Sequence, residues 1–267
     1  MLLRAVDYQR PASVADALRL LGENDNARAL AGGQTLVNVM KQRAASPDVL
    51  VDLAELEELT TVTATPDGGL ELGAMVTLAQ LVDSDDVRAQ RPILAQVAAT
   101  IADVQVRNRG TVGGNVCSND PTNHLPPLTT ALGATMTIAS KDGERQVTAE
   151  DFFLGVYMTA AGPGELLTKV SIPPRGGTGD GFASLAIGRD GTGIVNVAAS
   201  VNGEARVAIG CVSAVPVLVT SDPAEDSVKE AVRGAGLDPP SDVHASADYR
   251  RHLAEVLALR AVREALA

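Results

Sequence analysis

Tryptophan is absent from this 267-residue sequence, and the other aromatic residues are scarce, with three tyrosines and three phenylalanines. Proteins that bind single-stranded nucleic acid stack the bases on aromatic side chains, and neutralising the phosphates takes a basic surface. The formal net charge is -11. We therefore expect no nucleic acid partner.

Cysteine and histidine are scarce as well, with two and three residues. Cys117 and Cys211 are too far apart for a Cys-x-x-Cys motif, and an iron–sulfur cluster takes about four thiolates. The histidines show no metal-ligand spacing, so we expect no metal site in this chain. A disulfide is possible by count, but the lack of a secretion signal favours reduced thiols.

Long apolar runs are missing too. Gly, Asp or Lys interrupts each apolar stretch well before the roughly 20 residues that a membrane-spanning helix needs. The start, MLLRAVDYQRP, lacks the apolar stretch of a signal peptide. We expect a cytoplasmic protein with no integral membrane segment, and peripheral attachment to a membrane through partners stays open.

The first part of the chain has the pattern of a globular α/β unit. Apolar spacing predicts a helix from Val14 to Gly22, a strand at Ala27–Ala31, a helix at Leu36–Arg43 and a strand at Val49–Leu53. Strand, glycine turn, helix and strand in this order form a βαβ unit.

From about Thr60 the pattern changes to an α+β chain. Alternating residues around Asp67-Gly68-Gly69 predict a hairpin, and Arg175–Gly181 is the best linker candidate. Further helices are predicted at Leu78–Val82 and Ile93–Ile101, and further strands at Ala134–Ser140, Arg145–Val147, Glu165–Ile172, Val195–Val201, Glu204–Ile209 and Val212–Val219. A terminal helix, Ala247–Ala267, has an apolar face with Tyr249, Leu253, Val256 and Leu257, and a solvated face with Arg250, Arg251, Glu255 and Arg260.

The segment Arg109–Leu128, RGTVGGNVCSNDPTNHLPPL, reads as a long loop. It holds three glycines, three asparagines, three prolines and one carboxylate. Loops of this length are usually functional or disordered, and this one has too little charge and too many apolar residues for disorder. We therefore expect it to hold a ligand.

Two glycine loops are candidate ligand sites. The first, Ala31-Gly32-Gly33-Gln34-Thr35, follows a strand and opens a helix, so its backbone N–H groups suit an anion. It matches neither Gly-x-Gly-x-x-Gly nor a P-loop, and a plain strand-to-helix turn is the alternative. The second, Thr111-Val112-Gly113-Gly114-Asn115, has the same ingredients. Together the two loops could clamp one pyrophosphate through backbone N–H groups.

Three charged or polar residues near the second loop have open roles. Asp120 could accept hydrogen bonds from ligand hydroxyls, or it could form an Asx turn that leads into Pro121. Arg107 and Arg109 could neutralise phosphate, face a partner, or lie in solvent.

Several stretches resemble one family. AGGQTL and RNRGTVGGNVCSNDPTNHLPPL, with VDYQRPASVADA, GELLTKVSIP and DYRRHLA, resemble the FAD-binding medium subunit of molybdenum hydroxylases. The most similar group is the carbon monoxide dehydrogenase medium subunits, which are related to the flavin domain of xanthine dehydrogenase. The resemblance extends along nearly the whole chain.

The resemblance implies a fold, a set of domains and a site. The fold would be the p-cresol methylhydroxylase-type FAD-binding fold of two α/β subdomains, plus a C-terminal domain of antiparallel strands and helices. The FAD-binding domain would be residues 1–175, with subdomains of about 1–57 and 58–175, and the C-terminal domain residues 176–267. The implied FAD-binding residues are Ala31, Gly32, Gly33, Gln34, Thr35, Leu36, Thr111, Gly113, Gly114, Asn115, Asp120 and Leu167.

The resemblance also implies partners. In the family, a large subunit carries the molybdenum cofactor and a small subunit carries two iron–sulfur clusters. The medium subunit passes electrons through FAD to an external acceptor. We expect a dimer of heterotrimers, and no acid–base catalytic residue in this chain. The alternatives are a self-contained FAD-dependent oxidoreductase of the same fold, and a flavin-free scaffold.

The sequence departs from the family at three places, one of which is Ile194, where some relatives have a tyrosine that faces the flavin. His124 stands where many relatives have an acidic residue, and it could be a proton relay or a loop histidine that the backbone satisfies. Only Arg189 remains basic where relatives often have a lysine-rich segment.

Overall fold

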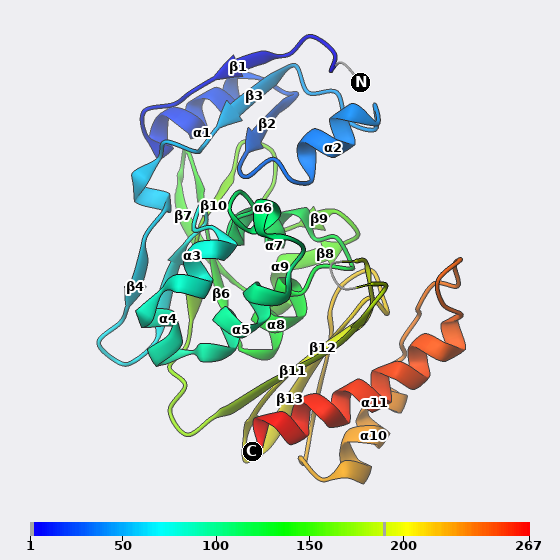
Figure 1. Ribbon diagram of the computed structural model, residues 1–267. Helices are drawn as coiled ribbons and strands as arrows, with labels where there is room; N and C mark the ends of the chain where they lie inside the picture. The colour runs from blue at the N-terminus through cyan, green and yellow to red at the C-terminus, as the bar shows by residue number, and fades with distance from the viewer. Residues whose placement is uncertain (1–2, 189–190) are drawn as a thin grey trace.

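The N-terminal part of the molecule is a small parallel sheet flanked by two helices (Figure 1). The computed structural model describes residues 3–188 and 191–267, so Arg189 lies outside the described residues. The sheet has the order β1-β3-β2. Its elements are β1 Asp7–Gln9, α1 Val14–Glu23, β2 Ala27–Leu30, α2 Leu36–Lys41 and β3 Val49–Asp52. Because β2 and β3 pair in parallel across α2, the predicted βαβ unit is confirmed.

Local sequence explains why α1 begins and how it packs. The Ser13 hydroxyl accepts a hydrogen bond from the Asp16 N–H at 3.1 Å, which is an N-cap. Ala17, Leu18 and Leu21 lie on one helix face and are buried against Val51 and its neighbours. Burial of this apolar face holds α1 on the sheet.

The middle part of the chain is an antiparallel sheet with the order β4-β5-β10-β6-β7. Its strands are β4 Val62–Ala64, β5 Leu70–Gly73, β6 Thr135–Ser140, β7 Gly143–Thr148 and β10 Leu166–Ile172. The helical segments are η1 Glu57–Leu59, α3 Leu78–Asp83, α4 Asp85–Gln90, α5 Pro92–Thr100, α6 Val104–Arg107, α7 Val112–Ser118, α8 Leu125–Ala131 and α9 Ala149–Phe152, and a small hairpin has β8 Phe153–Gly155 and β9 Met158–Thr159. The predicted hairpin around Asp67 is confirmed, because β4 pairs antiparallel with β5.

The prediction of one long loop over Arg109–Leu128 is wrong, because α7 and the start of α8 lie within it. Val112 and Val116 are one helical turn apart on α7, and both are buried. Their burial outweighs the poor helix propensity of the glycine pair between them. In α8, the prolines fall in the first turn, where a missing N–H costs nothing.

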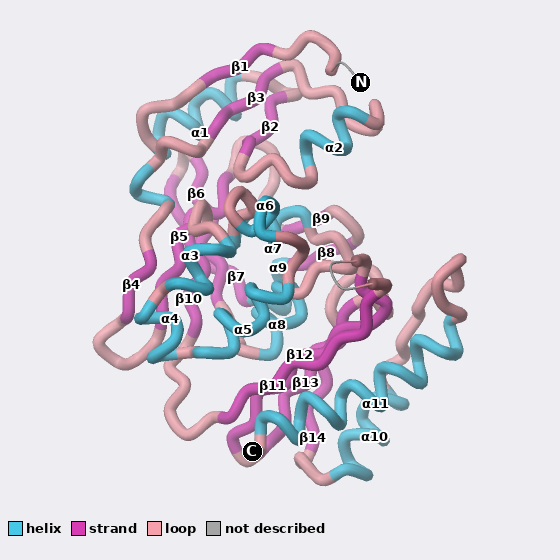
Figure 2. The backbone as a smooth tube through the Cα atoms, viewed as in Figure 1, coloured by secondary structure: helices cyan, strands magenta, loops and turns pink. Residues whose placement is uncertain are grey.

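The C-terminal part is a four-stranded antiparallel sheet covered by helices on both faces. The sheet has the order β11-β12-β13-β14. Its elements are β11 Gly179–Ala186, β12 Gly193–Asn202, β13 Glu204–Gly210, β14 Val217–Ser221, α10 Glu225–Gly234 and α11 Ala247–Ala265. Figure 2 shows α10 and α11 on one side of it, and α8 packs against β12 and β13. The strand predicted over Val212–Val219 lies instead at Val217–Ser221. The predicted linker, Arg175–Gly181, overlaps β11, which begins at Gly179.

The predicted faces of the terminal helix are partly wrong. Arg250 was expected in solvent, yet only 4% of it is exposed, and Tyr249, expected to pack, is 46% exposed. The Arg250 guanidinium donates to the carbonyl of Ile194 at 2.5 Å and to the Asp242 carboxylate at 2.7 Å. A charged side chain can be buried in this way because both partners are supplied by the fold.

A buried ion pair joins the middle and C-terminal parts. Arg91, just before α5, faces Asp180 of β11, with Nε 2.7 Å from Oδ2 and Nη2 2.7 Å from Oδ1. Both side chains are only 3% exposed. Nη1 also donates to the Pro173 carbonyl and Nη2 to the Ser200 hydroxyl. The pair fixes where β11 and β12 sit relative to α5.

Replacing Arg91 with alanine is expected to destabilise the fold strongly. The Asp180 charge would stay buried without a partner, and breaking such a pair costs about 3–5 kcal/mol. Urea unfolding followed by circular dichroism measures the change. Arg88→Ala is the control, because Arg88 is 51% exposed in its pairs with Asp83 and Asp85, where the loss should stay below about 1 kcal/mol. Equal losses for the two variants would contradict the role of the buried pair.

Candidate functional site

The two glycine loops come from different parts of the chain and touch each other. A Cβ atom on Gly32 would lie 1.9 Å from the carbonyl oxygen of Arg109 and 3.0 Å from Cα of Gly110. A Cβ atom on Gly114 would lie 3.5 Å from Cβ of Ala31. Backbone therefore packs on backbone at Gly32, where no other residue fits without moving a loop.

The first loop has backbone donors to spare. Within the described residues, the N–H groups of Gly33, Gln34 and Thr35 have no protein acceptor. The turn is held by the Gln34 side chain, whose Nε2 donates to the Gly32 carbonyl at 3.0 Å, and Gly33 has a φ of +73°. Consecutive free N–H groups of this kind form a concave anion site.

An open polar cavity of about 270 Å³ lies at this first loop. It is lined by the loop, by one face of α2, by Asp52 and by Arg109; the lining residues are Leu30, Ala31, Gly32, Gly33, Gln34, Val37, Asn38, Lys41, Asp52 and Arg109. Asp52 ends β3 and Leu30 ends β2, so the cavity lies at the carboxyl end of parallel strands, where α/β folds bind ligands. Sequence reasoning missed Asn38, Lys41 and Asp52, although the position of Asp52 at the end of a predicted strand was a usable signal.

The backbone N–H groups of the second loop already donate to acceptors within the protein. Gly113 N–H donates to the Ala74 carbonyl at 2.8 Å, Gly114 N–H to the Thr111 hydroxyl at 2.9 Å, and Asn115 N–H to the Thr111 carbonyl at 2.9 Å. These three N–H groups are therefore not free for the predicted clamp on a pyrophosphate. The group of this loop that lacks a partner among the described residues is the buried Oδ1 of the Asn115 side chain.

The second loop is fixed to the middle sheet. A Cβ atom on Gly113 would lie 2.7 Å from both Cβ and the carbonyl oxygen of Ala74. The Ala74 N–H in turn donates to the Thr168 carbonyl at 2.9 Å, at an irregularity of β10 next to Leu167. Leu167 itself is buried in the core. Its contact with a ligand stays a prediction. In the structure, its side chain packs in the core beneath the strand that supports the second loop.

Asp120 forms the Asx turn that was the alternative for it. Its Oδ1 accepts from the Thr122 N–H at 3.0 Å and from the Thr122 hydroxyl at 2.8 Å, while Oδ2 accepts from the Tyr157 hydroxyl at 3.0 Å. Burial, and then the Asp120 charge, raise the pKa of Tyr157. Asp120 does not line the cavity at the first loop. A role in binding ligand hydroxyls stays a prediction.

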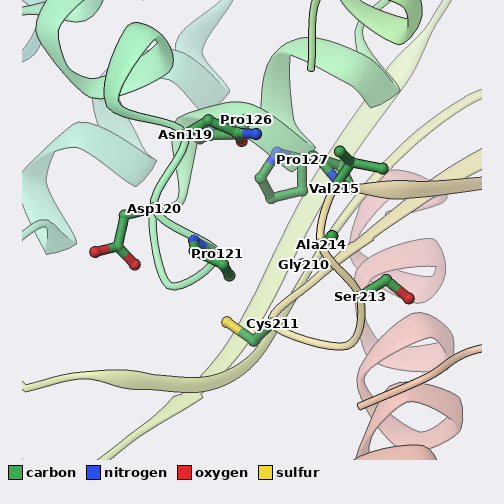
Figure 3. A pocket seen from close by; sticks show the side chains of 11 residues that line it. Asn119, Asp120, Pro121, Pro126, Pro127, Gly210, Cys211, Ser213, Ala214 and Val215 are labelled. Carbon is green, nitrogen blue, oxygen red and sulfur yellow. The ribbon is translucent and has the colours of Figure 1, made fainter. Parts of the chain in front are cut away.

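The loop of Asp120 also rests on the C-terminal sheet. Figure 3 shows Pro121 and Pro127 near the turn at Cys211, with the Asp120 carboxylate directed away from Cys211. The space between them is about 10 Å³, enough for one water molecule at most. This small pocket is therefore a packing gap and not a ligand site.

Burial holds His124, Cys117 and Cys211 in their neutral forms. Burial lowers the pKa of His124 to about 4, and its ring centroid lies 5.2 Å from that of Phe182. Burial raises the pKa of Cys117 and Cys211 to about 12. At neutral pH the thiols are protonated and therefore poor nucleophiles.

The residues fit a flavin dinucleotide. The N–H groups of Gly33, Gln34 and Thr35 face no protein acceptor among the described residues, and the buried Asn115 Oδ1 lacks a donor. Buried polar atoms are rarely left unpaired unless a ligand or water satisfies them. A pyrophosphate with nearby hydroxyl and amino groups supplies what this arrangement lacks.

Comparison with known proteins agrees with this geometry. Residues 4–175 match the model of the FAD binding domain in molybdopterin dehydrogenase. This chain belongs to that family. The carbon monoxide dehydrogenase medium chain of Afipia carboxidovorans is 36% identical, over 100% of this chain and 99% of the relative. The glyceraldehyde dehydrogenase medium chain of Sulfolobus acidocaldarius is 33% identical, over 96% and 97%.

Solved structures give the same result. Reconstituted CO dehydrogenase from Oligotropha carboxidovorans superposes with a TM-score of 0.93 at 35% identity, over 99% of both chains. Quinoline 2-oxidoreductase from Pseudomonas putida 86 gives 0.92 at 34% identity, over 99% of this chain and 98% of that one. The predicted family, fold class, FAD cofactor and oxidoreductase-subunit class are thus confirmed. Within the described residues, no group of three or more His, Cys, Asp or Glu side chains could hold a metal ion, and no helix has the length and apolarity to cross a membrane.

Gly32→Ala is expected to weaken FAD binding in this domain. The new Cβ would overlap the Arg109 carbonyl and push the two loops apart. An overpacking cost of about 1–3 kcal/mol on the loop arrangement that binds FAD lowers the affinity about 5- to 150-fold. Titration of the flavin-free chain with FAD measures the change. The control is Gly22→Ala, because a Cβ at Gly22 in α1 meets no atom within 4 Å. Unchanged affinity in Gly32→Ala would mean that the two loops need not touch.

His124 is expected to make the folded chain less stable in mild acid. Its pKa is about 4 in the fold and about 6.5 when unfolded. Between these values the unfolded chain binds more protons, so the free energy of unfolding decreases as pH falls from 6.5 to 4. His124→Gln should flatten this part of the curve in urea unfolding at several pH values. His252→Gln, at an exposed position of α11, should retain the wild-type slope; equal flattening in both variants would contradict the assignment.

Proposed function

We propose that this chain is the FAD-carrying electron-transfer subunit of a heteromeric molybdenum hydroxylase. The carrying observation is the meeting of the two glycine loops in a chain that matches medium chains of such enzymes end to end. Bound FAD would accept electrons from iron–sulfur clusters on a partner chain and pass them to an external acceptor. This chain's own residues would bind the cofactor, orient it and limit its contact with water.

The proposed FAD contacts divide between the two loops. Ala31, Gly32, Gly33, Gln34, Thr35 and Leu36 would follow the pyrophosphate, chiefly through the free N–H groups of the first loop. Thr111, Gly113, Gly114 and Asn115 would form the opposite wall, with Asn115 Oδ1 accepting from the cofactor. Asp120 is proposed to bind the ribityl or ribose hydroxyls, and Leu167 to make a backbone and apolar contact with the flavin or adenine. No acid–base residue is assigned to this chain.

The similarity to medium chains implies partner chains, and the cysteine count agrees with it. Two cysteines cannot supply the roughly eight thiolates of two iron–sulfur clusters, so the clusters would lie on a small subunit and the molybdenum cofactor on a large one. One structurally similar protein is described as a carbon monoxide dehydrogenase that lacks its Mo-pyranopterin moiety. We propose a dimer of heterotrimers in the cytoplasm, with peripheral attachment to a membrane through partners as the alternative.

The proposed domain limits are 1–175 and 176–267, with a subdomain division near residue 57. They are supported by three clusters of buried apolar residues, centred on the N-terminal, middle and C-terminal parts of the chain. The first cluster also takes in Met75, Ala139 and Leu166, and the second takes in Ala198 and Ala208. The ion pair between Arg91 and Asp180 would then lie at the joint of the two domains.

The absorption spectrum of the purified chain is the first test. We expect the visible bands of a flavin, one FAD per chain after release by denaturation, and partner chains that co-purify from the native source. Gly114→Asp should lose the flavin, because a charged side chain would enter the contact with Ala31. The control is Gly177→Asp, since a Cβ at Gly177 meets no atom within 4 Å. Substrate turnover by the flavin-loaded chain alone would overturn the subunit role, and full flavin in Gly114→Asp would overturn the loop assignment.

A further inference from the structure

Two exposed cations line the cavity at the first glycine loop. Lys41 is the last residue of α2, and Arg109 is the residue whose carbonyl packs against Gly32. Within the described residues, neither side chain has an ion pair or a hydrogen bond. Other cations of the chain, such as Arg19, Arg145 and Lys169, are paired with carboxylates.

The remaining charged group of the cavity is Asp52, and its oxygens are already engaged. The Tyr8 hydroxyl donates to Oδ2, and the Ala54 N–H donates to Oδ1 at 3.0 Å. Two cations and one carboxylate leave the lining with one net positive charge. In a protein with a formal net charge of -11, this is a local reversal of sign at the place where free N–H groups gather.

The two loops supply only neutral donors, which do not balance the negative charge of a pyrophosphate. The first loop supplies neutral donors at Gly33, Gln34 and Thr35, and the glycines of the second loop have no free N–H to add. Charge-assisted hydrogen bonds are roughly twice as strong as neutral ones. Arg109 is suited to add one, because the contact with Gly32 fixes its backbone beside the first loop.

We propose that Lys41 and Arg109 are charge-neutralising residues for the pyrophosphate of FAD. This inference rests on the proposed function, since it places further residues in the same site. Lys41 at the end of α2 and Arg109 just before the second loop would hold the phosphates from two different elements. Asp52 acts against them electrostatically and limits how tightly an anion is held.

The test is a titration of flavin-free, full-length chain with FAD, followed by the change in flavin fluorescence. Lys41→Met and Arg109→Met keep much of each side chain and remove its charge. Each is expected to raise the dissociation constant for FAD about tenfold, with a smaller effect in high salt, which screens exposed charges. Lys41→Arg should bind nearly as well as the unmodified chain, and Asp52→Asn should bind more tightly.

Matched controls separate this effect from general electrostatics. Lys141 and Arg260 are exposed and line no part of the cavity, so Lys141→Met and Arg260→Met should leave the affinity unchanged. Circular dichroism confirms that every variant is folded. Failure of the unmodified chain to bind FAD would overturn the proposed function itself. Tight, salt-insensitive binding by Lys41→Met and Arg109→Met, or equal losses in the controls, would overturn only the role of the two cations.

Discussion

The close approach of Gly32 to the Arg109 carbonyl is the contact on which the site depends. It brings the loop after β2 into contact with the loop before α7, although β2 belongs to the N-terminal sheet and α7 packs on the middle sheet. A side chain of any size at position 32 would separate these segments, since the Arg109 oxygen lies only 1.9 Å from where its Cβ would be. The glycine is therefore required by packing between subdomains, in addition to any requirement of a ligand.

The two loops contribute in different ways although their sequences look alike. The first keeps three backbone N–H groups free, so it can donate to an anion. The N–H groups of the second loop donate to Ala74 and Thr111, and these hydrogen bonds make the loop rigid. A rigid wall opposite a donor-rich loop limits the loss of conformational entropy when a cofactor binds, which is the benefit of preorganisation.

Sequence patterns were sufficient where local rules and packing agree. The apolar spacing of α1 and the strand patterns over Val195–Val201 and Glu204–Ile209 are local signals, and each element forms as expected. The patterns failed where distant groups decide. Val112 and Val116 form a helix through a glycine pair because the core buries them, and Arg250 is buried because Ile194 and Asp242 meet it. Lys41 and Asp52 join the site only once α2 and β3 are placed in space.

The charge of the whole protein says little about the charge of its site. At physiological ionic strength, interactions between exposed charges are largely screened beyond about 8 Å, so most carboxylates on the surface act weakly on this cavity. Nucleic acid needs many cations spread over a long face, and an acidic protein lacks that face. One pyrophosphate needs only a few donors in one place. Three free N–H groups with Lys41 and Arg109 beside them meet that need within a cavity of about 270 Å³. An acidic chain can therefore bind a dinucleotide while it excludes longer polyanions.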